Sequence, residues 1–351
     1  MPSSTLVSGI SVRAFTARLK RPFVTSLGRK DSSCNVGMTI TLRGGARGYG
    51  EASSSLALAH LTPEGLARTM TRLGRSCMGR DAAGWRGLVA RAWKEHEASA
   101  PAVSAFEAAL LDAALCAQGL TLRSWLGGAL DRTLTDVTLS AWDAKTTCAA
   151  AAEAARDGFR SLKIKVGPDH AENVSRVKAA LDAMPLAKRG LVLDGNQGLT
   201  VAGSLALVEA CEKAGATVEL LEQPLSKHDR AGMRALTRRS PVPVAADEMV
   251  LSPADAVRAA DQGLASAINI KLAKSGISRA LEIAAVARAA GMGLMIGCMA
   301  ESGEGLTPSV HLALGTGFFR WTDLDSDYLH HDARPPKKWK RAGPVLEAVR
   351  P

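Results

Sequence analysis

Between residues 137 and 323 the chain alternates short apolar runs with longer segments in which hydrophobic residues recur at helical spacing. Three of the runs, 190–194, 218–222 and 242–247, end in an acidic residue, and the run 267–271 ends in a lysine. A repeated order of apolar strand, terminal charge and helix is typical of a parallel α/β barrel, whose chemistry lies at the carboxyl ends of the strands.

The spacing of the runs favours a closed barrel over an open sheet. Successive strand ends lie 24 to 28 residues apart, and eight nearly equal βα units fit a (β/α)8-type barrel. We therefore assign residues 129–328 to a barrel domain. The predicted strand ends fall near residues 142, 166, 194, 222, 247, 271, 297 and 323.

Residues 1–128 have a different pattern, which predicts a separate α+β domain packed on the barrel. Alternating apolar residues favour an antiparallel sheet, and three segments with helical spacing follow it. The predicted strands cover residues 5–16 and 36–42, and a third begins at 49–51. The predicted helices lie near 63–75, 81–97 and 101–118.

Two segments lack a regular pattern. Residues 19–31 contain Pro22 and Gly28, which interrupt regular structure, and this segment is predicted to be a mobile loop over the barrel mouth. Residues 329–351 are rich in proline and basic residues. We expect them to form either a tail or a segment that returns to the first domain.

The composition narrows the classes of function. Lysine and arginine exceed aspartate and glutamate by 44 − 34 = 10, but the basic residues are scattered without interleaved aromatic residues, which argues against nucleic-acid binding. The six cysteines show no CxxC or zinc-site spacing, as expected of a reduced, cytoplasmic protein. No run of ~20 apolar residues predicts a membrane span.

Three acidic residues, Asp194, Glu222 and Asp247, end consecutive strands of the predicted barrel. Carboxylates that converge from neighbouring strands repel one another unless a cation binds between them. A hard divalent ion with oxygen ligands, Mg²⁺ ahead of Mn²⁺, fits this set. The alternative interpretation is that the three residues are helix caps or surface acids.

Lysines occupy two further strands of the predicted barrel. Lys163 and Lys165 share one face of the second strand, and Asn269 and Lys271 share one face of the sixth, because side chains alternate along a strand. Burial lowers the pKa of a lysine, so that it can act as a general base near neutral pH. The two strands lie on opposite sides of a barrel, which suits proton exchange on opposite faces of one carbon. Alternatively, the lysines only neutralise the acids.

Five motifs, in order, resemble the signature set of the enolase superfamily, muconate-lactonizing subgroup. They are Leu162-Lys163-Ile-Lys165, Leu193-Asp194-Gly-Asn196, Leu221-Glu222-Gln-Pro224, Ala246-Asp247-Glu248 and Asn269-Ile-Lys271-Leu-Ala-Lys274. The resemblance implies an α+β capping domain over the barrel and Mg²⁺ bound by the three strand-end acids. It also implies Lys165 and Lys271 as the acid/base pair, with Lys163 supporting Lys165. A lysine base beside Mg²⁺ is a known feature of this superfamily.

Two further stretches resemble the dipeptide epimerases of this subgroup. Residues 297–302, with Met299 as a candidate substrate contact, look like the segment after strand seven. Asp323-Leu-Asp325 looks like the paired-aspartate motif at the end of strand eight, where two unneutralised carboxylates suit the ammonium of a peptide N-terminus. Gly303-Glu304-Gly305, which directly follows residues 297–302, departs from the apolar, small-residue pattern expected there. Glu304 is therefore either a bystander or part of the pocket.

The reaction implied by the resemblance is a Mg²⁺-dependent epimerisation at the α-carbon of the C-terminal residue of a dipeptide. One lysine removes the α-proton, the enediolate carries its charge on oxygens held by the metal, and the other lysine returns a proton to the opposite face. In the 19–31 loop, Arg21, Arg29 and Lys30 are candidates to bind an acidic side chain, and Trp142 is a candidate pocket wall. We also expect a homo-oligomer.

Other functions stay open at this point. Muconate cycloisomerase, o-succinylbenzoate synthase and N-acylamino acid racemase act on substrates without a free ammonium, and Asp323 and Asp325 argue against them. A phosphate-binding barrel with Gly303 and Gly305 in its phosphate loop leaves the three acids unexplained. A non-catalytic binding protein leaves both lysines without a role, and a metallohydrolase lacks its His-x-His pair on strand one.

Overall fold

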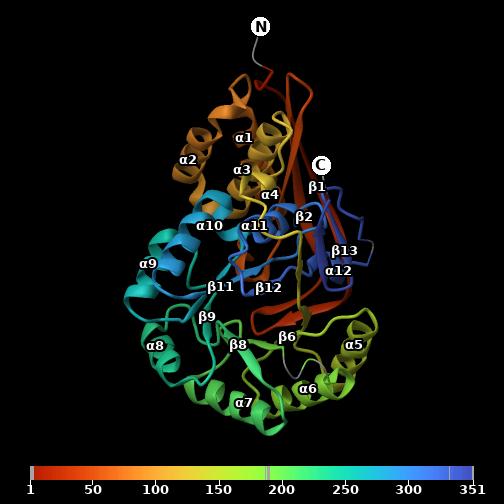
Figure 1. Ribbon diagram of the computed structural model, residues 1–351, viewed down its shortest axis with the longest axis vertical. Coiled ribbons are helices and arrows are strands. Elements are labelled where there is room, and N and C mark those ends of the chain that lie inside the picture. The colour runs from red at the N-terminus through yellow and green to blue at the C-terminus, as the bar shows by residue number, and fades with distance from the viewer. Residues whose placement is uncertain (1–3, 186, 188–189, 332, 350–351) are drawn as a thin grey trace.

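The computed structural model describes residues 4–185, 187, 190–331 and 333–349, and its centre is a parallel barrel surrounded by helices (Figure 1). Eight consecutive strands form one sheet in the order of the sequence. Each strand ends at, or within about three residues of, a strand end predicted above, so the barrel prediction is confirmed. The strands are β5 (Val137–Leu139), β6 (Leu162–Lys165), β7 (Leu191–Asp194), β8 (Val218–Glu222), β9 (Val244–Ala246), β10 (Ala267–Ile270), β11 (Gly293–Gly297) and β12 (Trp321–Asp323).

The first and last strands of the sheet approach each other, because Asp136 N donates to Thr322 O at 3.0 Å. A helix follows each strand. The helices are α5 (Ala144–Arg156), α6 (His170–Ala183), α7 (Val201–Lys213), α8 (Arg230–Arg239), α9 (Pro253–Asp261), α10 (Leu272–Ala289), α11 (Thr307–Thr316) and the short α12 (Ser326–Leu329).

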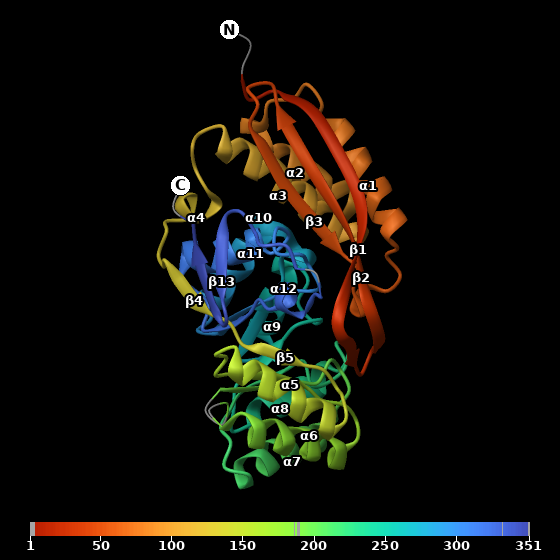
Figure 2. The same ribbon diagram turned by 90° about the vertical axis from the view of Figure 1, so that its right-hand side faces the viewer.

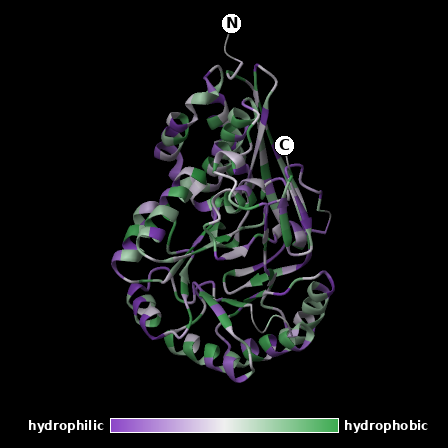
Figure 3. Cartoon of the chain, in the orientation of Figure 1, coloured by the Kyte–Doolittle hydropathy of each residue, from purple (hydrophilic) through white to green (hydrophobic). Residues whose placement is uncertain are grey.

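The local sequence explains how each βα unit forms. Barrel strands are buried along their length, and in β6 this includes both lysines. Helices α5 to α9 are capped by polar side chains; α7, for example, begins after Thr200, whose hydroxyl accepts a hydrogen bond from Gly203 N at 3.0 Å. A cap of this kind stabilises a helix by about 1 kcal/mol. Figure 3 shows hydrophobic and hydrophilic residues in alternating bands along these helices, as expected when one face is buried.

The N-terminal part is an antiparallel sheet covered by helices on one face. Its strands are β1 (Val7–Thr25), β2 (Gly28–Leu42) and β3 (Arg47–Ser53), and the helices are α1 (Pro63–Cys77), α2 (Trp85–His96), α3 (Ala100–Cys116) and α4 (Leu122–Trp125). The stretch 82–116 is long and apolar enough to cross a membrane, yet 78% of its most apolar window is buried within the protein. Helix α3 is therefore the core helix of this part, packed between β3 and α10.

The prediction of a loop over residues 19–31 is wrong. The segment is the end of a β-hairpin in which β1 and β2 pair as far as Thr25 and Gly28. Pro22 is tolerated because it falls in a register shift between Arg18 and Phe23, where the ladder is irregular. Figure 2 shows this hairpin extending from the N-terminal sheet down to the barrel, where Ser26 Oγ donates to Asn196 O at 2.5 Å.

The C-terminal segment returns to the start of the barrel region. Strands β13 (Trp339–Ala342) and β14 (Val345–Ala348) pair with each other, and β14 pairs with β4 (Arg132–Leu134), which gives a small antiparallel sheet. The same segment contacts the N-terminal part, where His331 N donates to Arg18 O at 2.8 Å. Residues 332, 350 and 351 of this predicted segment lie outside the described residues, and the domain boundaries at 128 and 328 stay predictions.

Substituting Gly50 by alanine is expected to lower the free energy of unfolding by about 1–3 kcal/mol, because it overpacks the core. A Cβ atom at Gly50 would lie 1.9 Å from Ala105 O of α3, so β3 and α3 would have to separate. The matched control is Gly87→Ala in α2, where a Cβ meets nothing within 4 Å. Urea unfolding of both variants measures the difference, and equal stability would show that β3 does not pack on α3 as described.

Candidate active site

A cavity of about 310 Å³ opens at the carboxyl ends of the barrel strands, between the barrel and the β1–β2 hairpin. Polar and charged residues form the barrel side of the cavity, and mostly apolar residues form the hairpin side. The barrel side includes Thr138, Lys165, Asn196, Asp247, Glu248, Lys271, Lys274, Cys298, Met299, Asp323 and Asp325. The other side includes Phe23, Leu27, Lys30, Leu56 and Leu58.

The three acids predicted as metal ligands are buried at the barrel mouth and form ion pairs with the predicted lysines. Lys165 Nζ lies 2.6 Å from Asp194 Oδ2. Lys163 Nζ lies 3.0 Å from Asp194 Oδ2 and 2.7 Å from Glu222 Oε2. Lys271 Nζ lies 2.8 Å from Asp247 Oδ2 and 4.0 Å from Glu222 Oε1. The structure therefore brings all six residues together.

The strand register explains this arrangement. Lys165, Asp194 and Glu222 are direct partners across β6, β7 and β8. Asp247 directly follows β9, and Lys271 directly follows β10. Because β7, β8 and β9 lie between β6 and β10 in the sheet, Lys165 and Lys271 flank the acids from opposite sides.

The ion pairs control the protonation of the site. Burial opposes ionisation of Asp194 and Asp247, yet the ammonium groups of Lys165 and Lys271, respectively, hold the pKa of each carboxyl well below its usual range. Burial disfavours the charged form of Lys271, but the Asp247 carboxylate raises its pKa above the usual value. The expectation that burial lowers the pKa of the barrel lysines is therefore wrong for Lys163 and Lys271, whose ion pairs outweigh desolvation.

The donor set fits a hard divalent cation. Buried carboxylates outnumber buried lysines at the barrel mouth. Among the described residues, Asn196 Oδ1 and Glu248 Oε2 are buried without a hydrogen-bond partner. Burial and the Asp247 charge raise the pKa of Glu248 to about 7. In proteins, Mg²⁺ binds at sites that have an excess of negative charge and oxygen atoms without other partners. The acids are Asp194, Glu222, Asp247, Glu248, Asp323 and Asp325, and the lysines are Lys163, Lys165, Lys271 and Lys274.

Asp323 and Asp325, at and just after the end of β12, lie across the barrel from the acids at the ends of β7 to β9, and of the two only Asp323 has an ion pair among the described residues. Asp323 Oδ2 lies 2.6 Å from Lys163 Nζ, so the prediction of two unneutralised carboxylates is wrong for Asp323. Asp325 has no ion-pair partner in the described part of the chain; its Oδ2 accepts a hydrogen bond from Thr138 N at 2.6 Å. Burial and the Asp323 charge raise the pKa of Asp325 to about 6.

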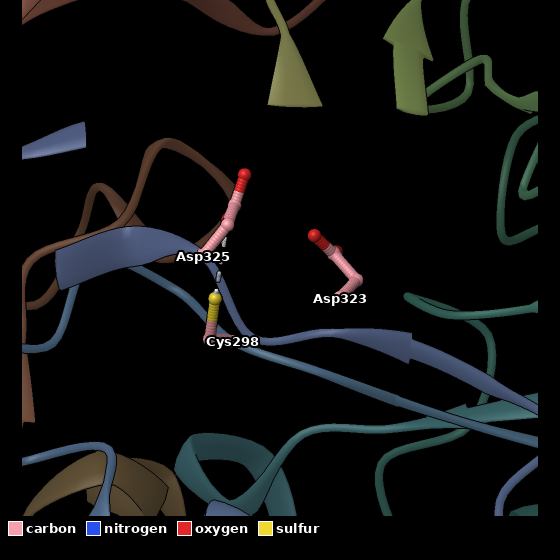
Figure 4. A group of neighbouring side chains, drawn as sticks. All are labelled: Cys298, Asp323 and Asp325. Atoms are coloured by element: carbon pink, nitrogen blue, oxygen red, sulfur yellow. Dashed lines mark hydrogen bonds between the residues drawn. The ribbon is translucent and has the colours of Figure 1, made fainter. Parts of the chain in front are cut away.

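Cys298 completes a group with the two aspartates (Figure 4). One ligand atom from each of the three lies within 4.8 Å of the others, and Cys298 Sγ donates to Asp325 Oδ1 at 3.8 Å. Burial and the neighbouring carboxylates raise the pKa of the Cys298 thiol well above its usual value. A protonated thiol is a poor metal ligand, so the group suits a substrate ammonium better than a second metal ion.

The remaining predicted contacts divide into those at the cavity and those outside it. Met299 lines the cavity, as does Lys30. Arg21 does not: its guanidinium lies 2.7 Å from Glu153 and it lines a separate small cavity, so its predicted substrate contact has no support here. Trp142 lines that small cavity too. Glu304 accepts a hydrogen bond from Lys337 N at 3.1 Å, away from the cavity.

Three residues contribute to the site in ways that the sequence analysis did not assign. Lys274 Nζ lies 2.6 Å from Asp247 Oδ1, and Asn269 Nδ2 donates to Glu222 Oε1 at 2.7 Å. Asn196 Nδ2 donates to Glu248 Oε1 at 3.3 Å. The signal for Asn269 was present, because it shares a strand face with Lys271, and all three residues lie within the quoted motifs.

Comparison with known proteins identifies the family. The sequence model of the family described as "Enolase C-terminal domain-like" matches residues 147–342. The chain is 38% identical to an aromatic dipeptide epimerase from Herpetosiphon aurantiacus over 92% of this chain and 90% of that protein. The chain belongs to the enolase superfamily. Within this superfamily it is also 33% identical to an L-Ala-D/L-Glu epimerase from Thermotoga maritima, over 93% of this chain and 94% of that protein.

Solved structures of the enolase superfamily share the whole fold. A dipeptide epimerase from Enterococcus faecalis, solved with Mg and the dipeptide L-Leu-L-Tyr, superposes with a TM-score of 0.92 at 29% identity. The match covers 98% of this chain and 97% of that one. The predicted fold class, a (β/α)8-type barrel with an N-terminal α+β part, is therefore confirmed at the level of the superfamily.

Proposed function

We propose that this protein is a Mg²⁺-dependent dipeptide epimerase that inverts the α-carbon of the C-terminal residue. The observation that carries the proposal is the placement of Lys165 and Lys271 on opposite sides of three buried carboxylates, with Asp325 across the barrel. Full-length similarity to several dipeptide epimerases at 30–38% identity supports it.

Asp194, Glu222 and Asp247 are the residues proposed to hold Mg²⁺. When bound, the ion would hold the substrate carboxylate and stabilise the negative charge that develops on its oxygens as the α-proton leaves. Its charge would also compete with the ammonium groups that now pair with these acids. Lys165 and Lys271 would then lose the carboxylates with which they are now paired.

The two lysines perform the proton transfer in this proposal. Whichever of Lys165 and Lys271 is neutral accepts the α-proton, and the opposite one, as an ammonium, donates a proton to the other face of the carbon. Lys163 has a positioning role: its ammonium joins Asp194, Glu222 and Asp323, so it holds acids on both sides of the barrel.

Asp325 is proposed to bind the substrate ammonium. A substrate whose carboxylate lies at the acids of β7 to β9 and whose ammonium lies at Asp325, after β12, must be longer than one amino acid. A dipeptide has this length. The related muconate cycloisomerase, o-succinylbenzoate synthase and N-acylamino acid racemase reactions offer Asp325 no cation, and a buried carboxylate without a cationic partner is costly.

The remaining expectations concern the protein's surroundings. All six cysteines are free thiols, two of them exposed, which supports a reducing compartment such as the cytoplasm. A homo-oligomer stays a prediction.

A phosphate loop at Gly303 and Gly305 is disfavoured by the position of Glu51. The Glu51 carboxyl group lies so close to Gly305 that a Cβ there would be 2.7 Å from its carboxyl carbon, and a carboxylate would repel a phosphate.

The test of the proposed function is deuterium uptake. In D₂O with Mg²⁺, the protein is expected to introduce deuterium at the α-carbon of the C-terminal residue of a free dipeptide and to produce its epimer. The same assay on N-acetylated dipeptides and N-acylamino acids provides the comparison. A preference for the N-acylated compounds would contradict the dipeptide assignment and favour N-acylamino acid racemase activity.

Asp325→Asn is expected to lower kcat/KM for a free dipeptide about 10- to 100-fold, because a hydrogen bond to a charged group contributes about 1.5–3 kcal/mol. The variant should leave the low activity on the N-acetylated counterpart unchanged. Equal losses of kcat/KM on both substrates in Asp325→Asn would show that Asp325 does not recognise the ammonium.

In the parent, kcat/KM for the free dipeptide should fall as the pH drops below about 6, since Asp325 then becomes protonated.

A further inference from the structure

Arg21, Arg29 and Lys30 of the β1–β2 hairpin are equal candidates from the sequence, and the structure separates them. Arg21 is ion-paired with Glu153, and Arg29 is ion-paired with Asp31 at the exposed hairpin end, with 63% of its side chain accessible. Lys30 alone of the three lines the main cavity. It is the cation of the hairpin that a bound substrate can reach.

The ammonium of Lys30 has unused hydrogen-bonding capacity. Among the described residues its hydrogen-bond acceptor is Ser54 O at 3.0 Å, and no carboxylate forms an ion pair with it. A lysine has three N–H donors, so two remain for a ligand. Burial lowers the pKa of Lys30 more than the nearby Glu301 charge raises it. A ligand carboxylate would oppose this lowering.

The neighbours of Lys30 locate it at one end of the substrate. It shares a small side cavity with Met299 and Ala300 after β11, and with Leu329 of α12. Met299 directly follows Cys298, whose Sγ donates to Asp325 Oδ1. Lys30 therefore lies on the side of the site where the ammonium is expected, away from the acids at the ends of β7 to β9.

From these contacts we infer that Lys30 selects dipeptides whose first residue carries an acidic side chain, aspartate or glutamate. The inference rests on the proposed function. The charges of the pocket complement such a residue: Asp325, supported by Asp323, faces the α-ammonium, and Lys30 faces the side-chain carboxylate. An amide side chain of the same shape forms a weaker hydrogen bond with an ammonium. An apolar first side chain leaves the two unused N–H donors of Lys30 without a partner.

The experiment compares kcat/KM for L-Glu-L-Ala and L-Gln-L-Ala, which differ only in the charge of the first side chain. The parent is expected to favour L-Glu-L-Ala about tenfold or more. Lys30→Met should remove this preference, because kcat/KM for L-Glu-L-Ala should fall more than kcat/KM for L-Gln-L-Ala, whose amide forms the weaker hydrogen bond with the ammonium. Lys30→Glu should reverse the preference, so that L-Lys-L-Ala becomes better than L-Glu-L-Ala.

Arg29→Met is the matched control, because it removes the neighbouring cation, which does not line the cavity. It should retain the preference for L-Glu-L-Ala. The parent comparison needs no variant, so poor folding of a variant leaves the inference testable. Equal kcat/KM for the two substrates in the parent, or a preference that survives Lys30→Met, overturns the inference alone. Absence of α-deuterium uptake from every dipeptide overturns the proposed function as well.

Discussion

Replacing Lys165 or Lys271 with alanine is expected to lower kcat for dipeptide epimerisation about 10²- to 10⁴-fold, the usual contribution of a positioned acid or base. In the proposed mechanism each lysine serves one face of the α-carbon, so neither can substitute for the other. Their placement on opposite sides of Asp194, Glu222 and Asp247 is the structural reason. Epimerisation is measured by polarimetry or chiral chromatography of the product.

Isotope exchange separates this two-base scheme from a general loss of activity. Each single variant keeps one base, so each should still exchange the α-proton of one epimer in D₂O, and the two variants should act on opposite epimers. Lys213→Ala on α7, where 74% of the lysine side chain is exposed, is the control and should behave as the parent. Full epimerisation by either active-site variant would contradict the scheme.

Removal of Mg²⁺ by a chelator is expected to abolish activity, and Glu222→Gln is expected to weaken Mg²⁺ binding by about 100-fold or more. Removing a residue that only hydrogen-bonds a metal ligand already lowers metal affinity about 10- to 100-fold. Removing a ligand itself should lower the affinity at least as much. Glu222 is central because it contacts both Lys163 and Lys271 and is fully buried. Isothermal titration with Mg²⁺ measures the affinity without reference to activity.

The thermal midpoint gives a second measurement, because a ligand that binds only the folded state raises it. Mg²⁺ should stabilise the parent and Glu209→Gln, a control at an exposed position of α7, but not Glu222→Gln. If Glu222→Gln binds Mg²⁺ as the parent does, the ion lies elsewhere, and the three strand-end acids serve only to neutralise the lysines.

The sequence by itself determined the barrel and the residues at its mouth. Parallel strands buried on both faces require apolar runs, and the residue at the end of each run reaches the open end of the barrel. The charges at the ends of β7, β8, β9 and β10 could therefore be located from periodicity alone. The alternation of side chains along β6 also identified Lys163 and Lys165 as neighbours. These features depend on contacts within one strand or between consecutive strands.

The tertiary structure decided what lies across the barrel. Lys163 pairs with Asp323, 160 residues away, and this pairing leaves Asp325 as the carboxylate free to receive a cation. No local pattern encodes such a pair, because it depends on the curvature that brings β12 near β5 and β6. The hairpin is similar: Pro22 and Gly28 suggested a loop, but pairing with β2 overrode this local signal. That pairing alternates side chains between two environments, and therefore Lys30 reaches the cavity while Arg29 remains in solvent.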